Sequence, residues 1–128
     1  DHHTLHSKAQ KILDDLKITV PSTRVTVKNL SGGQRQAIAI GSAVSFQPKI
    51  LILDEPTAAL AVKEVNEVLE LIGRLKAQGV GVILISHRLQ DIMQVTDRIM
   101  VMYEGQNVAE RKTKETTLEE IIRLIVRG

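Results

Sequence analysis

Two aliphatic runs separated by a long amphipathic segment constrain this fold more than any other feature. The run Ile50-Leu51-Ile52-Leu53 lies between Pro48 and Asp54-Glu55-Pro56, and residues 80–85 form a second apolar run. Between them, apolar residues recur at helical spacing until Gly79 stops the pattern; they are Val62, Val65, Val68, Leu69, Ile72 and Leu75. This order predicts two parallel strands joined by a helix, with each strand buried and covered on both faces.

The same periodicities predict the remaining elements. Helices are expected over 1–16, from Ser31 onward with a stripe of Ala37, Ile40, Gly41 and Val44, and over 88–95. We expect a linking loop over residues 18–28 and a third strand over 98–103. A turn at 104–107 is expected to lead into a return strand over 108–110. Thr117 and Glu120 form a capping box that opens a final helix. The order of elements predicts an α/β fold with a mostly parallel sheet flanked by helices.

Composition narrows the function classes. A chain of 128 residues is one ordinary domain or a piece of one, and its single Phe, single Tyr and absent Trp leave an aliphatic core. The net charge of +2, from 17 basic and 15 acidic residues, does not imply nucleic-acid binding. The absence of cysteine excludes disulfides and thiol chemistry, and every apolar run is shorter than the ~20 residues that cross a bilayer. Without an initiator Met, we expect the natural start to lie upstream.

Two carboxylates, Asp54 and Glu55, end the first predicted strand. Asp54 can hold a hard cation such as Mg²⁺ there, and Glu55 can point toward whatever the cation activates. A solvated strand end is the alternative interpretation of this pair.

A second motif, Ser31-Gly32-Gly33-Gln34, opens the predicted helix that precedes this strand. Ser31 and Gln34 fit the capping box of an ordinary helix. Gly32 and Gly33 also remove Cβ atoms and expose backbone N–H groups at the positive end of the helix dipole, which suits an anion such as phosphate. Capping and phosphate binding are compatible, so both interpretations stay open.

Histidine occurs near one of these motifs and at the N-terminus. His87 follows the second strand, at the edge where ligands gather in open parallel sheets. If the two strands are neighbours, its imidazole lies near Asp54 and Glu55, although a single histidine is usually structural. His2, His3 and His6 lie near the chain terminus, and we assign them no role.

Four motifs in this order and spacing resemble those of the ATP-binding cassette (ABC) transporter ATPases. They are Leu30-Ser31-Gly32-Gly33-Gln34, Ile50 to Pro56, Thr57-Ala58-Ala59-Leu60 and Ser86-His87, which look like the signature motif, the Walker B strand, the D-loop and the switch histidine. The resemblance covers essentially the whole chain. Residues 57–64 and 108–122 look most like the ATPases of bacterial simple-sugar importers.

The resemblance implies a role for each site residue. Glu55 would position and polarise the attacking water, Asp54 would support Mg²⁺, and His87 would contact the γ-phosphate of ATP. The signature residues Ser31, Gly32, Gly33 and Gln34 would bind the ATP of the opposite subunit, and the D-loop residues Ala58, Ala59 and Leu60 would lie at the interface.

The resemblance also implies partners and a place in a larger protein. We expect a second ATP-binding domain, transmembrane permease subunits, an indirect link to a periplasmic or extracellular substrate-binding protein, no nucleic acid, and a peripheral location on the cytoplasmic face of the membrane. Residues 1–47 would be part of the helical subdomain and 48–128 the C-terminal part of a partial P-loop NTPase core. The function that the resemblance implies first is an ATP-hydrolysing subunit of an importer for simple sugars, which energises transport through nucleotide-driven dimerisation. A soluble ABC-type ATPase acting on ribosomes or DNA is the alternative, and a purely structural module is a third.

The chain departs from the family pattern in three places. No Gly-x-x-x-x-Gly-Lys-Ser/Thr loop occurs among its eight glycines, so we predict no ATPase activity for these 128 residues alone and expect that Walker A loop upstream. Gly41-Ser42 stands where many members carry Ala-Arg. Ala61 stands where an Asp usually ends the D-loop.

Overall fold

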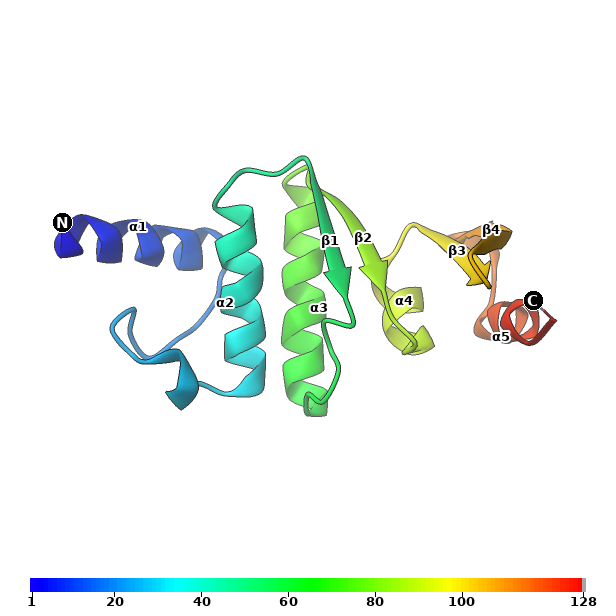
Figure 1. The fold of residues 1–128 in the computed structure, drawn as a ribbon, viewed down its shortest axis with the longest axis horizontal. Helices are drawn as coiled ribbons and strands as arrows, with labels where there is room; N and C mark the ends of the chain where they lie inside the picture. Colours follow the sequence, from blue (N-terminus) through cyan, green and yellow to red (C-terminus); the bar gives the residue numbers. More distant parts are fainter. Residues whose placement is uncertain (128) are drawn as a thin grey trace. The chain divides into compact units, whose positions relative to one another are not determined.

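The computed structural model describes residues 1–127 and divides the chain into two compact units, Asp1–Ile85 and Ser86–Gly128. Each unit mixes helices with a two-stranded sheet (Figure 1). The α/β class predicted from the order of apolar segments is therefore confirmed. No helix among residues 1–127 is both long enough and apolar enough to cross a membrane.

Three α-helices make up most of the first unit. They are α1 (His2–Asp15), α2 (Gly32–Val44) and α3 (Val62–Ala77), with a short 3-10 turn η1 (Val27–Asn29) before α2. The stripe of α3 is buried as predicted at Val65, Val68, Leu69, Ile72 and Leu75. Val62 is 77% exposed, so its predicted place in the stripe is wrong: it is the first residue of the helix.

The two predicted strands of this unit are neighbours. Strands β1 (Ile50–Asp54) and β2 (Gly81–Ile85) pair in parallel, in a register that runs from Ile50 opposite Gly81 to Asp54 opposite Ile85. Helix α3 connects them, so residues 50–85 form the predicted strand–helix–strand unit. Because the pair is parallel, the carboxyl ends of both strands, Asp54 and Ile85, lie at the same edge of the sheet.

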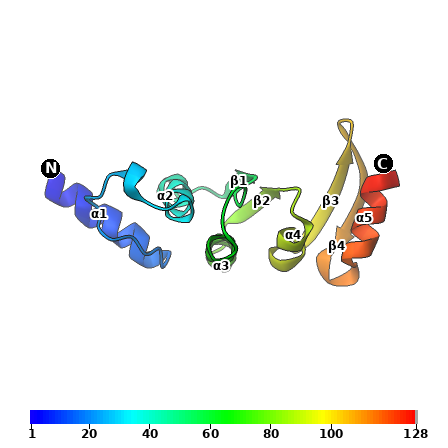
Figure 2. The same cartoon turned by 90° about the horizontal axis from the view of Figure 1, so that it is seen from below.

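The expectation that both faces of these strands are covered is wrong. Leu51 and Leu53 are each 8% exposed, whereas Ile50 and Ile52 are 62% and 63% exposed. Figure 2 shows α3 on one face of the β1–β2 pair. A single helix layer buries alternate residues only, because successive side chains of a strand point to opposite faces.

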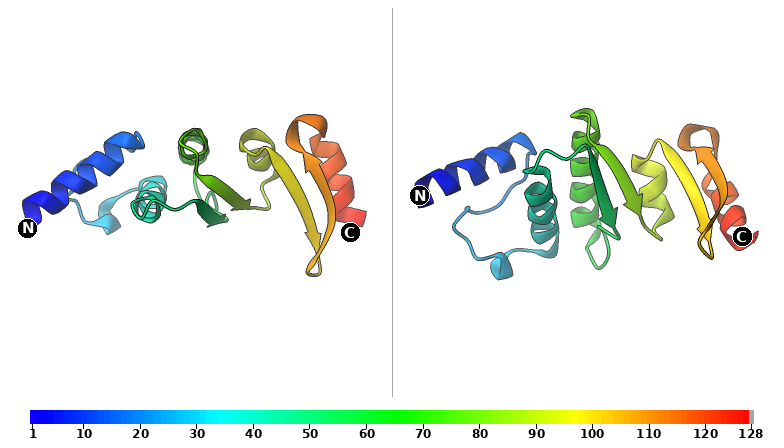
Figure 3. Two further views of the ribbon diagram at one scale, coloured as in Figure 1. Left: turned by 90° about the horizontal axis from the view of Figure 1, so that it is seen from above. Right: turned by 45° about the horizontal axis from the view of Figure 1, so that its top comes forward.

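The second unit contains α4 (Leu89–Val95), β3 (Arg98–Tyr103), β4 (Gln106–Lys112), the 3-10 turn η2 (Thr113–Glu115) and α5 (Leu118–Arg127). Strands β3 and β4 form an antiparallel hairpin with an irregularity between Val101 and Met102. Helix α5 packs along this hairpin (Figure 3), where Ile99, Val101 and Ile121 form the core. The predicted return strand is thus longer than 108–110, and the hairpin is a sheet separate from β1–β2.

Candidate functional site

The glycine turn at 31–34 caps α2 as the capping-box interpretation predicted. The hydroxyl of Ser31 accepts from the Gln34 N–H at 3.1 Å, and the Gln34 Oε1 accepts from the Ser31 N–H at 3.0 Å. The two bonds satisfy N–H groups that have no partner within the helix. The turn is therefore held in a fixed shape, with its remaining N–H groups at the positive end of α2.

Both glycines of this turn lie against residues that follow β1. A Cβ on Gly32 would lie 3.1 Å from Leu60 Cδ2, and a Cβ on Gly33 would lie 2.8 Å from Glu64 Oε2. Leu60 belongs to the predicted D-loop and Glu64 to the first turn of α3. The absence of side chains at Gly32 and Gly33 thus allows α3 to approach α2 closely, whatever ligand the turn also binds.

Glu64 contacts the glycine turn through its carboxylate, although the sequence did not predict it as a site residue. It accepts from the N–H of Gly33 and, at 3.3 Å, from the N–H of Ala61. The bond from Gly33 is the largest cause that lowers the pKa of Glu64, followed by the bond from Ala61. The only signal in the sequence was a glutamate three residues after the N-cap position Ala61, a pattern common to ordinary capping.

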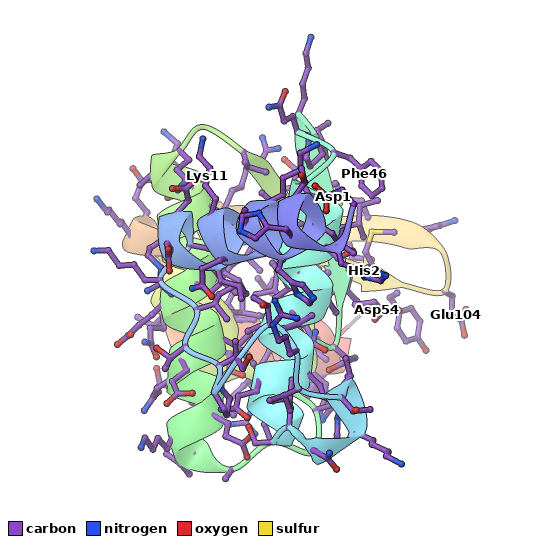
Figure 4. All side chains as sticks on the ribbon, turned by 90° about the vertical axis from the view of Figure 1, so that its left-hand side faces the viewer. Asp1, His2, Lys11, Phe46, Asp54 and Glu104 are labelled. Atoms are coloured by element: carbon purple, nitrogen blue, oxygen red, sulfur yellow. The ribbon has the colours of Figure 1, made fainter. Side chains whose placement is uncertain are left out.

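Asp54 and Glu55 lie at the carboxyl edge of the parallel pair, as predicted. Asp54 is the last residue of β1 and its side chain is exposed (Figure 4). Glu55 is half-buried, and its N–H donates to the carbonyl of Ile85, the last residue of β2, at 2.7 Å. This bond extends the β1–β2 contact by one residue and fixes the start of the following turn.

The backbone at Glu55 is in the left-handed region, with φ of 51°, and Ala59 has φ of 61°. A residue with a Cβ disfavours this region by roughly 1–2 kcal/mol. Between them, Thr57 is 1% exposed and the Ala58 N–H donates to the carbonyl of Glu55 at 3.2 Å. Residues 55–60 therefore form a tight turn held by a buried Thr57, with Ala58 and Ala59 exposed on its surface.

A divalent cation at this edge would need further oxygen ligands from a bound phosphate group and from water. Mg²⁺ is usually held by one or two carboxylates together with substrate phosphates and water. Asp54 offers one exposed carboxylate, and residues 1–127 hold no cluster of three acidic, histidine or cysteine side chains suited to a metal. The residues fit a cation shared with a bound phosphate group.

His87 lies in the second unit, in the bend between β2 and α4, and is exposed. The next residue is anchored on both sides: the Arg88 N–H donates to the Ser86 Oγ at 3.0 Å, and the Arg88 guanidinium pairs with the buried carboxylate of Asp91 at 2.9 Å. The local backbone of His87 is thus constrained. Its approach to Asp54 and Glu55 remains a prediction.

The N-terminal histidines stay outside this site. His6 Nδ1 lies 3.2 Å from the Thr23 Oγ1 and so links α1 to the loop before η1. This contact gives His6 a structural role that the sequence did not predict.

Comparison with known proteins gives this arrangement a family context. Residues 2–58 match the family model described as ABC transporter. The chain is 46% identical over 114 residues to a xylose/arabinose import ATP-binding protein of Sulfolobus acidocaldarius, and 40% identical over 126 residues to a ribose import ATP-binding protein of Lactococcus lactis. These alignments cover 89% and 98% of this chain but 45% and 25% of the two relatives. The chain therefore spans less than half the length of either one.

Solved structures agree with the sequence comparison. An ATP-binding cassette of an ABC transporter in its ADP conformation superposes with a TM-score of 0.79 at 31% identity, over 95% of this chain and 50% of that one. A dimeric cassette in a post-hydrolysis state with ADP and Pi superposes with a TM-score of 0.69 at 27% identity, over 84% of this chain and 46% of that one. The fold described above is therefore similar to about half of such a cassette.

Proposed function

We propose that this chain, which belongs to the ABC transporter ATPase family, is part of an ATP-hydrolysing subunit that energises the import of a simple sugar. The observation that carries the proposal is the edge of the β1–β2 pair. Asp54 and Glu55 end β1 there, and the Glu55 N–H is bonded to the end of β2. The names of the relatives, xylose/arabinose and ribose import proteins, support the sugar class.

Glu55 is the proposed general base. The bond from its N–H to the carbonyl of Ile85 holds its backbone at the edge of the sheet, so the side chain starts from a fixed position there. A carboxylate in this place orients a water molecule and accepts its proton during attack on a phosphoryl group. Asp54 would hold Mg²⁺, which neutralises charge on the phosphates when bound. His87 would contact the γ-phosphate of the same nucleotide.

The signature turn would serve a different nucleotide. Ser31, Gly32, Gly33 and Gln34 present the capped N-terminus of α2, which suits a phosphate of the ATP held by a second ATP-binding domain. Leu60 packs over Gly32, so the D-loop of this chain would reach the same interface. The dimeric state of the solved cassette with ADP and Pi supports a dimer as the active form.

The remaining partners follow from the import function. Transmembrane permease subunits would bind the ATPase at the cytoplasmic face of the membrane, and a periplasmic or extracellular binding protein would deliver the sugar to them. Residues 1–47 would belong to the helical subdomain and 48–128 to the ATPase core. The import names of the relatives reported above favour this function over a soluble ATPase acting on ribosomes or DNA.

Substitution of Glu55 tests the proposal in the natural full-length protein. Glu55→Gln should lower ATP turnover by roughly 10²-fold or more, because general-base assistance is lost, while ATP binding is retained. Glu104→Gln is a matched control: Glu104 is an exposed glutamate that is also in the left-handed region, with φ of 46°, but it lies in the β3–β4 turn. Full turnover in Glu55→Gln would remove Glu55 from its proposed role. The 128-residue chain alone should show no turnover.

A further inference from the structure

The N–H of Gly33 already has an anionic acceptor within this chain. It donates to one carboxylate oxygen of Glu64, and the other oxygen accepts from the N–H of Ala61 at 3.3 Å. These N–H groups lie at the starts of α2 and α3, which run in the same direction with their N-termini at the same end (Figure 1). One carboxylate thus lies between the positive ends of two helix dipoles, a place that favours negative charge.

Glu64 also covers Gly33. Gly33 is buried, although Ser31 two residues earlier is exposed, and a Cβ on Gly33 would lie 2.9 Å from the Glu64 Cβ. Both residues line an open groove of about 430 Å³, whose walls also carry the cations Lys17, Lys63 and Arg74 and the carboxylates Glu67 and Glu70. The groove gives an anion access from solvent. Such an anion reaches the Gly33 N–H only after the Glu64 carboxylate has moved.

Glu64 carries its negative charge at neutral pH. The bonds from Gly33 and Ala61 hold the pKa of its carboxyl below the ordinary value, and the nearby charge of Arg35 acts in the same direction. A phosphate group approaching the signature turn therefore meets a like charge on the acceptor that it must replace.

We propose that Glu64 is an internal competitor for the phosphate of ATP, whose carboxylate occupies the Gly33 N–H until the nucleotide of a second subunit displaces it. The inference rests on the proposed function, which assigns the signature turn to that nucleotide. When the Glu64 carboxylate is displaced, the N–H of Ala61, the residue after Leu60 of the D-loop, also loses its acceptor. Phosphate binding at the signature turn would thereby change the start of α3 in the same step.

Neutralising the competitor should make ATP-driven dimerisation easier. In the natural full-length protein with Glu55→Gln to block hydrolysis, the dimer fraction is measured by light scattering against ATP concentration at fixed Mg²⁺. Glu64→Gln keeps the length of the side chain but removes its charge, and a charge-assisted hydrogen bond is about twice as strong as a neutral one. The ATP concentration at half-maximal dimerisation should fall by about five- to tenfold.

Two further variants make the result specific. Glu67→Gln makes the same charge change on an exposed residue of the same groove and should leave the midpoint unchanged. Glu64→Asp keeps the charge but shortens the side chain, and it should also lower the midpoint, so the test survives if Glu64→Gln does not fold.

An unchanged or higher midpoint in the folded Glu64 variants, with normal dimerisation of the parent, overturns the competitor role and assigns Glu64 to holding the turn in shape. Failure of the parent and every variant to dimerise with ATP overturns the proposed function itself, and the competitor role with it.

Discussion

Gly33→Ala should destabilise the protein, although glycine inside a helix is normally unfavourable. Alanine is favoured over glycine in a helix interior by about 1 kcal/mol, less at a helix start. The new Cβ would lie 2.8 Å from Glu64 Oε2 and 2.9 Å from the Glu64 Cβ, both closer than real contacts of this kind. Overpacking of this severity costs typically about 1–3 kcal/mol. The steric cost exceeds the helical gain, so we expect a net loss of about 1–2 kcal/mol.

The same helix pair supplies a matched control of opposite sign. Gly73 lies within α3 and is exposed, and a Cβ added there would meet no atom within 4 Å. Gly73→Ala should therefore stabilise the protein by roughly 0.5–1 kcal/mol through helix propensity alone. The free energy of unfolding of the natural full-length protein, followed by circular dichroism in denaturant, should move in opposite directions for the two variants.

A second substitution separates the two close contacts. Glu64→Ala removes the carboxylate but keeps the Cβ that lies 2.9 Å from the new methyl group. Gly33→Ala should thus remain destabilising in the Glu64→Ala background. If Gly33→Ala stabilises the protein as much as Gly73→Ala does, the close packing of α3 on the signature turn is refuted.

Two further changes test the backbone and the electrostatics. Ala59→Gly should stabilise the protein by about 0.5–1 kcal/mol, because relief of the left-handed φ of 61° outweighs the added freedom of the unfolded chain; a lower denaturation midpoint would contradict this. The bond from Thr116 is the largest cause that lowers the pKa of Glu120, followed among the favourable contacts by the bond from Arg111. Its stabilisation is present above the ordinary pKa of 4.5 and is lost as pH falls through the lower folded value. The difference in melting temperature between the natural protein and Glu120→Gln should therefore shrink below pH 4.5, and a constant difference would argue against it.

The spacing of apolar residues correctly predicted those helices and strands that pack against a single neighbouring element. The α3 stripe and the parallel pairing of residues 50–54 with 81–85 follow directly from apolar spacing, because the helix has one face to bury and the strands share one helix. The capping box of Ser31 and Gln34 is equally local, and both of its hydrogen bonds are formed.

Features that depend on tertiary approach were not visible in the sequence. An apolar run such as Ile50–Leu53 has no alternation that shows which face is covered, so its open face was missed. Glu64 resembles an ordinary helix-capping glutamate until α2 brings Gly33 against it. The left-handed backbone of Glu55 occurs where its N–H donates to Ile85, a residue distant in the sequence.

The exposed face of the β1–β2 pair should limit the solubility of the purified chain. Ile50, Ile52, Ile83 and Ile85 are each 49–63% exposed and belong to two neighbouring strands, so they form a contiguous β-branched surface. Such surfaces promote self-association through the hydrophobic effect. Preparations of these 128 residues alone should be prone to precipitate at high concentration, and lysine at Ile52 or Ile83 is the substitution most suited to keeping them in solution.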